Sequence, residues 1–514
     1  MNSADQAVVC MYDTRRKNEK YELPSNYKCL NMSKEIALDW ISSNESRIIE
    51  ISNRIWELAE LGLMEYESSK LLADELEKKG FRVDRGIAGM PSAFSATYGS
   101  GKPVIGIMGE YDALPGLSQK PVPFKEPLKE GGPGHGCGHN IHGTSGAAAA
   151  IATKVAMEAN DIEGTVKFFG CPAEEIDIGK VFMVRNGVFK GVDACLSHHP
   201  GQSNTASLSS STATTQARYI FKGIAAHAAG DPEDGRSALD AVELMNMGVN
   251  YLREHVIEKA RIHYIIEDGG EVPNVVPPYA RSWYFIRAPE REQVSEIYAR
   301  VLDVAKGAAL MTGTTHDARI VTAISNMIPN KTLADLVVSN MRMIGAPEYT
   351  KEENDFAHEI VDTIPSDKQK TILRGVNRYG LRKLDRLKIV RDIIEPSGEG
   401  EVGGGSTDVS DVSWNMPTME FTSTCAVLGT PGHSWQGTAQ YGMSIGHKGL
   451  IFAAKTLSTC VLDLLTKPSI LKDAKEELAD RMQGRVYTSP LPPDLKPPLE
   501  EAKRQMEISQ RERK

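Results

Sequence analysis

Cysteine is scarce in this sequence, and it is widely scattered. Seven cysteines occur among 514 residues, and their odd number and wide spacing do not resemble a disulfide scaffold. We therefore expect most of them to be reduced, buried and chemically inert.

Dense basic segments and long apolar runs are also missing. The formal net charge is −9, with no dense run of lysine and arginine, which argues against a nucleic-acid partner. No uninterrupted apolar run approaches the roughly 20 residues of a membrane span, and the amino-terminal residues lack the apolar centre of a signal peptide. We expect a cytoplasmic protein with no membrane partner.

The composition that remains is that of an ordinary globular protein, with 41% hydrophobic and 25% charged residues. A chain of 514 residues is too long for a single hydrophobic core. The sequence therefore predicts at least two domains.

The order of the predicted elements indicates an α/β domain. Apolar residues recur at helical spacing from Ser33 to Leu61, and a second helix is predicted from Ser69 to Lys79. Short apolar runs then alternate with a helix of small residues, in AFSATYG, PVIGIMG, GTSGAAAAIATKVAMEA, TVKFFG and DACLS. This alternation predicts a mixed, mostly parallel sheet with flanking helices, whose ligand sites lie beyond the carboxyl ends of the strands.

The order of predicted strands and helices changes in residues 214–326. Strand, helix, two strands, helix and strand follow one another, which is the βαββαβ order of a ferredoxin-like unit. The unit is predicted to be inserted into a catalytic domain made of residues 33–213 and 327–466. Residues 1–32 are predicted to be an amino-terminal extension. The Pro-rich tail, residues 467–514, is expected to be partly mobile or to pack on a partner.

The segment GHGCGHNIHG (134–143) is rich in possible metal ligands. Taken alone, Cys137 and His139 form a weak signal, because short Cys/His pairs occur in many polar loops. Three other segments strengthen it. They are PAEEID with Glu174 and Glu175, SHHP with His198 and His199, and GTPGHSWQG with His433.

Each of these segments has an ordinary explanation as an acidic turn, a strand end or a surface loop. Adjacent side chains point in different directions, so one of the two glutamates can bind a metal while the other faces a bound water. Only one of the two adjacent histidines needs to be a ligand. Together, one thiolate, several imidazoles and two carboxylates would satisfy a pair of divalent ions.

Eight motifs in this order resemble the M20 metallopeptidase and amidohydrolase family, in the branch with Cys-Gly-His in place of a bridging aspartate. The resemblance runs from about Lys34 to Leu465, and several motifs are similar to those of members that act on p-aminobenzoyl-glutamate and on dipeptides. The motifs are GEYDALPG (109–116), GHGCGHNIHG (134–143), CPAEE (171–175), SHHP (197–200), AAHAAGDPEDGRSALDAV (225–242), GGEVPNVVPPYA (269–280), GSTDVSDVSW (405–414) and GTPGHSWQGTAQYGMSIGHKG (429–449).

The resemblance implies a metal centre of two divalent ions per subunit, with zinc, manganese or cobalt as the candidates. It makes Glu174 the general base and Asp112 a residue that orients a metal ligand. His198 is the alternative to His199. The metal ligands that the resemblance implies are Cys137 as the bridging thiolate, His139, Glu175, His199 and His433.

The resemblance also implies a lid or dimerisation role for the inserted unit, in a homodimer or a related hetero-oligomer. His227 would then act in catalysis from the partner subunit, and Asn274 would bind substrate. Without the resemblance, His227 would be interpreted as an ordinary histidine at a strand end. Arg287 is a candidate for binding a substrate carboxylate, although an arginine at a strand end is more often solvated. Many members have aspartate in place of Asn140, a change expected to lower ligand basicity and shift metal preference.

These features favour a metal-dependent hydrolase that cleaves the amide bond of an N-acyl amino acid, an aryl-amide of glutamate or a small dipeptide. Two alternatives remain open. One is hydrolysis of another C–N bond, as in an aromatic amine deaminase. The other is a non-catalytic member of a hetero-oligomer, although the presence of every candidate ligand and of Glu174 counts against it.

Overall fold

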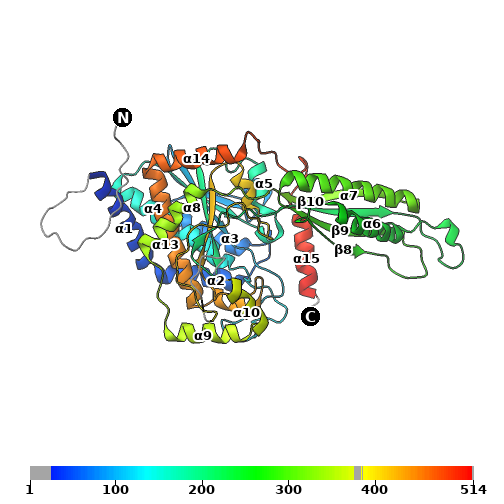
Figure 1. Cartoon of the computed structure of the whole chain (residues 1–514), viewed down its shortest axis with the longest axis horizontal. Coiled ribbons are helices and arrows are strands. Elements are labelled where there is room, and N and C mark those ends of the chain that lie inside the picture. The colour runs from blue at the N-terminus through cyan, green and yellow to red at the C-terminus, as the bar shows by residue number, and fades with distance from the viewer. Residues whose placement is uncertain (1–24, 376–383, 385, 512–514) are drawn as a thin grey trace.

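The computed structural model describes residues 25–375, 384 and 386–511, which form a large α/β lobe and a smaller lobe that projects from it (Figure 1). The strands are β1 (Arg82–Arg85), β2 (Phe94–Ser100), β3 (Val104–Glu110), β4 (Gly164–Cys171), β5 (Ala194–Gly201), β6 (Thr205–Ala206), β7 (Ala213–Lys222), β8 (Arg261–Asp268), β9 (Tyr279–Ala288), β10 (Thr315–Ile324) and β11 (Thr418–Thr424). The α-helices are α1 (Ser25–Ser43), α2 (Glu45–Leu58), α3 (Tyr66–Lys78), α4 (His139–Asn160), α5 (Gly179–Arg185), α6 (Ala238–Leu252), α7 (Arg291–Thr312), α8 (Lys331–Ile344), α9 (Lys351–Asp362), α10 (Ser366–Gly375), α11 (Val409–Ser413), α12 (Trp435–Tyr441), α13 (Ser444–Thr466), α14 (Pro468–Met482) and α15 (Leu499–Arg511).

The larger sheet has seven strands in the order β1-β2-β4-β3-β5-β11-β6. Its centre is parallel, because β3 pairs in parallel with β4 and β5, and β5 pairs in parallel with β11. The outer strands β1, β2 and β6 pair antiparallel with their neighbours. Ile105, Ile107 and Phe168 of the central strands are fully buried, as expected for strands covered by helices. The mixed, mostly parallel sheet predicted from the sequence is confirmed.

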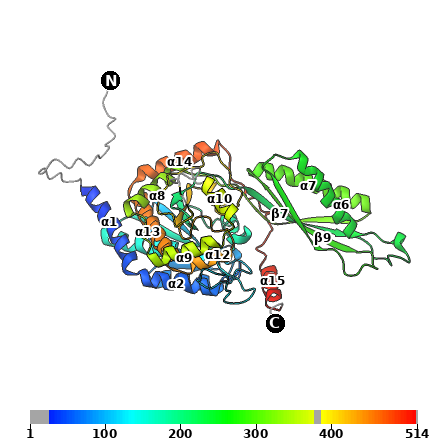
Figure 2. The same ribbon diagram turned by 60° about the horizontal axis from the view of Figure 1, so that its bottom comes forward.

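The smaller lobe contains the βαββαβ unit. Its four antiparallel strands lie in the order β10-β7-β9-β8, and α6 and α7 lie on one side of them (Figure 2). Buried and half-buried residues alternate along β9 from one end to the other. This period of two places one side of the strand against α6 and α7. The predicted ferredoxin-like unit is thus present.

The amino-terminal helices differ from the prediction. The run from Ser33 to Leu61 forms two helices, α1 and α2, separated at Asn44, whose side-chain amide donates to Trp40 O (2.8 Å). Helix α1 begins at Ser25, inside the predicted extension, because extending a helix that has already formed costs little. The rest of that extension, residues 1–24, lies outside the described part of the chain.

The carboxyl-terminal residues pack on the chain itself, which corrects the expectation of a mobile or partner-bound tail. Helix α14 packs against α8, and Arg185 of α5 donates to Pro492 O (2.7 Å). Glu501 of α15 then pairs with Arg218 on β7 of the smaller lobe. The tail is also held by apolar side chains that recur every three to four residues and pack on a buried apolar cluster, a spacing that the sequence reasoning passed over among the prolines. They are Leu491, Leu495, Leu499, Ala502 and Met506.

Helix α13 is the one described helix that is long and apolar enough to cross a membrane, with a mean hydropathy of 1.4 over its most apolar window. However, 89% of that window is buried inside the protein. The helix packs against α4, α1 and α8. It therefore has the position of a core helix.

Candidate metal centre

The predicted site residues lie where the central parallel strands end. Asp112 follows β3, the short helical turn Glu174–Ile176 follows β4, and His199 lies in the last half of β5. His433 is on the segment that follows β11, the neighbour of β5. This edge is the place where α/β sheets build ligand sites.

The five residues predicted as metal ligands come together in two overlapping groups. The ligand atoms of Cys137, His139 and His199 lie within 4.8 Å of one another, and so do those of Cys137, Glu175 and His433. Cys137 Sγ is 3.3 Å from His199 Nε2, and His433 Nε2 is 3.4 Å from Glu175 Oε2. Because Cys137 belongs to both groups, the arrangement offers two adjacent three-donor sites with a shared sulfur.

A glycine turn brings Cys137 and His139 into the site. Gly138, between them, has a φ of +79°, and a Cβ there would lie 2.9 Å from Pro200 Cβ. His139 then begins α4, which lies so close to β3 that a Cβ on Gly143 would be 2.6 Å from Glu110 O. Only glycine meets both requirements, so the small residues around the motif have a structural reason.

Asp112 orients two of the candidate ligands. Its Oδ1 lies 2.7 Å from His139 Nδ1, and its Oδ2 accepts the Glu175 backbone N–H (2.9 Å). With the Nδ1 proton directed at the carboxylate, Nε2 is the nitrogen of His139 left to face a cation. It is buried and makes no hydrogen bond among the described residues, although Glu110 Oε2 lies 3.3 Å away. His199 is arranged in the same way, because its Nδ1 lies 3.0 Å from Pro200 O.

The structure distinguishes His198 from His199. Both ring nitrogens of His198 are used, at 3.1 Å from Ser145 Oγ and 2.8 Å from Ser423 Oγ. His198 is fully buried, and burial holds its pKa well below the usual value. It belongs to neither candidate group, so His199 is the histidine that faces Cys137.

Burial dominates the protonation of the donors. It lowers the pKa of His199 and of His433, so both are neutral and keep a lone pair at neutral pH. Burial raises the pKa of the Cys137 thiol to about 12 and that of Glu175 to about 7. Burial also lowers the pKa of His139, but the Asp112 carboxylate and Cys137 outweigh burial, so the pKa of His139 is raised. A cation would be needed to hold the thiol as a thiolate.

Glu174 and Glu175 point to different places, as predicted for neighbouring side chains. Glu174 Oε2 is 4.0 Å from His139 Nε2, on the side of Glu110, whereas Glu175 faces Cys137 and His433. Burial, reinforced by the Glu110 carboxylate, raises the pKa of Glu174 well above its usual value. Glu174 is thus placed beside the sulfur-centred groups without being part of them, and its ligand atom lies within 4.8 Å of those of Glu110 and His139.

A buried ionic cluster beneath this site was not predicted. The Lys180 ammonium lies 2.6 Å from Glu110 Oε1 and also contacts the Asp408 carboxylate, and all three residues are fully buried. Lysine is among the residues least often buried, so no pattern around Lys180 indicated an interior position. The cluster joins three separate segments of the chain through one ammonium group.

His142 and Glu420 lie next to this cluster and, with Glu110, could be taken for a third cation site. The hydrogen bonds argue otherwise. The Glu110 backbone N–H donates to His142 Nδ1 (2.9 Å), so the proton of the neutral ring is on Nε2, 3.1 Å from Ser197 Oγ and 3.3 Å from Glu110 Oε2. A protonated nitrogen has no lone pair for a metal. His142 is better described as a donor that supports Glu110.

Glu65 is a second buried carboxylate that sequence reasoning missed. It accepts the Ala173 backbone N–H (2.8 Å) and the Ser92 hydroxyl (2.9 Å). Ala173 has a φ of +58°, a left-handed conformation immediately before Glu174. Burial, with the nearby Asp112 charge, raises the pKa of Glu65 to about 8. Glu65 therefore supports the turn that presents the two glutamates.

Residues predicted from the smaller lobe lie together but away from these groups. Asn274 and His227 are both exposed, a bridge pairs His227 with Val275, and Asn274 O accepts the Ala228 N–H (3.0 Å). Neither residue belongs to a candidate metal group, so an action of His227 in catalysis stays a prediction about a partner subunit.

Asn140 and Arg287 have structural partners. The Asn140 amide donates to Ser52 Oγ (3.0 Å) and to Tyr441 O (3.2 Å) and touches no predicted ligand, so its expected effect on ligand basicity is not supported. A carboxylate in its place could not donate to that carbonyl. Arg287 is half-buried, with its Nη1 3.5 Å from Ser406 Oγ.

The sequence of residues 106–358 matches the family described as peptidase family M20/M25/M40. A p-aminobenzoyl-glutamate hydrolase chain from Escherichia coli is 42% identical over 474 residues, which cover 89% of this chain and 97% of that protein. The chain belongs to the M20 family. Another relative is the mouse Xaa-Arg dipeptidase, 28% identical over 88% of this chain and 94% of that protein.

A solved M20 structure has the same fold. The dinuclear metal-binding M20 peptidase of Bacillus subtilis superposes with a TM-score of 0.52 at 17% identity, over 82% of this chain and 99% of that one. The family resemblance found in the motifs is thereby confirmed. The chain is an M20-family hydrolase that acts on amide bonds.

Proposed function

We propose that this M20 protein is a dinuclear metal-dependent amidohydrolase that releases an amino acid from an N-acyl or aryl-acyl amide. The observation that carries the proposal is the pair of three-donor groups that share Cys137, with Glu174 beside them. An aryl-amide of glutamate is the first candidate substrate, because the 42% identical relative bears that name. A dipeptide is the second, from the relative named as a dipeptidase.

The donor set fits two divalent ions. His139 Nε2 and Glu175 Oε1 are buried polar atoms without hydrogen-bond partners among the described residues, which is costly unless a cation is bound. Thiolate and imidazole donors suit zinc, and the carboxylate also suits manganese or cobalt. When bound, such ions supply an activated water at neutral pH and polarise the scissile carbonyl.

The residues of this chain supply the proton transfers and the alignment. Glu174 accepts a proton from the attacking water, since a carboxylate with a raised pKa is a competent base near neutral pH. The same carboxyl group then passes that proton to the nitrogen of the leaving amine. Asp112 keeps His139 and Glu175 aligned during both steps through its two carboxylate contacts.

His227 and Asn274 complete the proposal from the lid. We assign His227 of the partner subunit to the developing negative charge on the substrate oxygen, and Asn274 to substrate binding. Their joint placement beside one bridge of the smaller lobe supports a common function. An action on the partner subunit would also explain why neither residue belongs to a candidate metal group of its own chain.

The proposal is tested by metal content and product analysis together. The purified chain should bind two zinc, manganese or cobalt ions, lose activity after chelation and regain it when metal returns. A panel of p-aminobenzoyl-glutamate, N-acyl amino acids and dipeptides should yield a free amino acid. Ammonia release from an aromatic amine would favour the deaminase alternative, and turnover only with a second, different chain would favour the non-catalytic role.

Cys137→Ala should lower the metal content of the same preparation, because both groups lose their shared donor. Cys195→Ala is the matched control, since Cys195 is a fully buried free cysteine outside both groups. Elemental analysis of the two variants decides the matter. Full metal content in Cys137→Ala would contradict the shared-sulfur arrangement.

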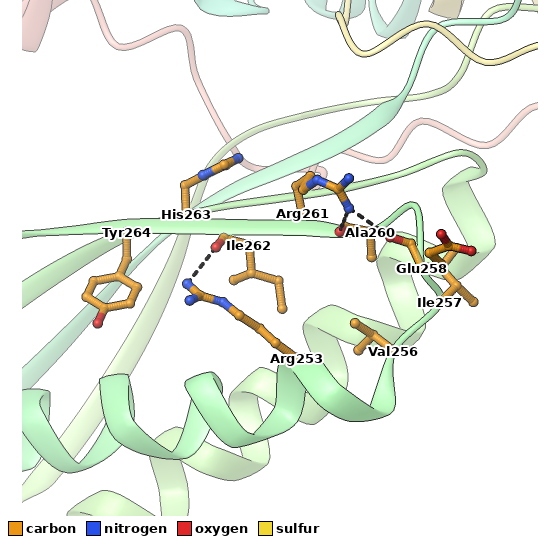
Figure 3. A pocket seen from close by; sticks show the side chains of 9 residues that line it. All are labelled: Arg253, Val256, Ile257, Glu258, Ala260, Arg261, Ile262, His263 and Tyr264. Carbon is orange, nitrogen blue, oxygen red and sulfur yellow. Dashed lines mark hydrogen bonds between the residues drawn. The ribbon is translucent and has the colours of Figure 1, made fainter.

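We also propose that the lid edge receives a second M20 chain. Strand β8 lies at the edge of the smaller sheet, and Ile265 and Ile266 on it are 57% and 45% exposed. On α6, Met247 and Tyr251 are 55% and 68% exposed. A hollow of about 760 Å³ lies at the start of β8, with Arg253 and Tyr264 on one side of the strand and His263 on the other (Figure 3). An apolar edge strand of this kind is a template for association.

The purified chain, with a monomer mass of 56.2 kDa, should therefore run as a dimer in light scattering. Ile265→Lys should shift it towards monomer, because a charge on the edge strand opposes pairing. Leu310→Lys, a change at another exposed apolar residue, on α7, is the control. A monomer at every concentration would mean that any second subunit is a different chain.

A further inference from the structure

A glutamine side chain holds the segment that precedes His433. Gln202 Oε1 accepts the Gly429 backbone N–H (2.6 Å), and Gln202 Nε2 donates to Thr430 O (2.7 Å). One side-chain amide thus satisfies a donor and an acceptor on neighbouring residues of that segment. Such a two-point contact fixes both the position and the orientation of the peptide.

A second glutamine holds the same segment from another element. Gln440 Oε1 accepts the Val427 N–H (2.8 Å), and Gln440 Nε2 donates to Thr430 Oγ1 (2.9 Å). Gln440 is fully buried and is part of α12, so it also supports the helix that follows. Gln202 is only half-buried and comes directly after β5.

His433 needs this support more than the other candidate ligands. Its side chain is 57% exposed, whereas those of Glu175 and His139 are 6% and 0% exposed. Its φ of +48° is a left-handed conformation that non-glycine residues adopt at a cost. Packing therefore does little to hold the imidazole, and the hydrogen bonds to its segment must do so.

Gln202 also links the two candidate metal groups. It follows His199 by three residues, at the end of β5, and the preceding Gly201 O accepts the N–H groups of Cys425 (2.8 Å) and Ala426 (3.1 Å). The end of β5 therefore contacts both the end of β11 and the segment that leads to His433. His199 belongs to one group of donors and His433 to the other.

We propose that Gln202 is a positioning residue that sets His433 relative to His199, and so determines how tightly the Cys137/Glu175/His433 group binds its ion. The proposal rests on the metal centre proposed above. Removing the amide should let the His433 segment relax while the Cys137/His139/His199 group stays intact. The expected result is selective weakening of one of the two ions.

The test measures cobalt binding to the metal-free, full-length chain by competition with a chromophoric chelator. Gln202→Glu keeps an acceptor for the Gly429 N–H but places an oxygen opposite Thr430 O. Gln202→Met keeps the shape and removes both hydrogen bonds. In each variant one ion should bind about 10- to 100-fold more weakly, as for residues that orient ligands, and the other should bind as in the wild type.

Gln369→Glu is the matched control. Gln369 is also half-buried, and its amide donates to the carbonyls of Val361 (2.9 Å) and Ile364 (2.8 Å), in a turn that carries no predicted ligand. It should bind both ions as the wild type does. Unchanged binding of both ions in the two Gln202 variants, equal weakening of both ions, or the same loss in Gln369→Glu would overturn the proposal.

His433→Ala separates this proposal from the one on which it rests. If His433→Ala weakens one ion and the Gln202 variants do not, only the positioning role is wrong. If His433→Ala leaves both ions bound as in the wild type, the metal centre itself is wrongly assigned.

Discussion

Glu174→Gln is expected to lower kcat by about 10²- to 10⁴-fold, the usual contribution of a positioned general base. Glutamine has the shape of glutamate but cannot accept the proton of an attacking water. Glu174 is outside both groups that share Cys137, so metal content and the unfolding temperature should stay as in the wild type. Steady-state kinetics, elemental analysis and thermal unfolding of one preparation check all three.

Glu175→Gln is the matched comparison, because the neighbouring carboxylate faces Cys137 and His433. It should lose metal, and lose activity for that reason. The two variants therefore differ in metal content although both are inactive. Glu174→Gln with activity near that of the wild type, or with the metal loss of Glu175→Gln, would assign the base to another residue.

Lys180→Met is expected to destabilise the larger lobe by about 3–5 kcal/mol, the usual effect of removing one partner from a buried ionic cluster. The ammonium contacts Glu110 and Asp408, and all three residues are fully buried. Methionine fills a similar volume, so the loss is electrostatic rather than a cavity. Two carboxylates would then remain in the interior without their cation.

The double variant Lys180→Met with Asp408→Asn should be less destabilised than the sum of the single variants, because it also removes one of the stranded charges. Lys351→Met should leave unfolding unchanged, since Lys351 is exposed and pairs with Asp355 on the surface of α9. Calorimetric unfolding of these variants provides the measurement. A Lys180→Met protein as stable as the wild type would mean that the cluster is not ionic.

Much of the fold was predictable because its signals are local. An apolar run such as VIGIM of β3 indicates a strand that is covered on both faces. The strict alternation along β9 indicates a strand that is covered on one face. The amino-terminal helix boundaries and the packing of the tail were predicted wrongly. Helix propagation to residues before Ser33 leaves no periodic pattern in the sequence. The tail does carry apolar residues at helical spacing, from Leu491 to Met506, but the prolines among them favoured the interpretation as a spacer.

The candidate site was also predictable only in part. The donor types were found from short motifs, and the role of Glu174 came from the resemblance of those motifs to the M20 family. Lys180 and Glu65 were missed because a buried charge looks like any exposed charge in a sequence. The choice between His198 and His199 also needed the structure, because alternate residues of β5 face opposite sides of the sheet.

The amino-acid sequence by itself determined the α/β architecture, the inserted βαββαβ unit and the inventory of sulfur, imidazole and carboxylate donors, because strand periodicity and turn chemistry act over a few residues. Only the tertiary structure decided that Cys137 lies within reach of both His199 and His433, and that a buried ammonium at Lys180 lies beneath them. Those distances depend on the order of β3, β5 and β11 in the sheet, which brings together segments far apart in the chain.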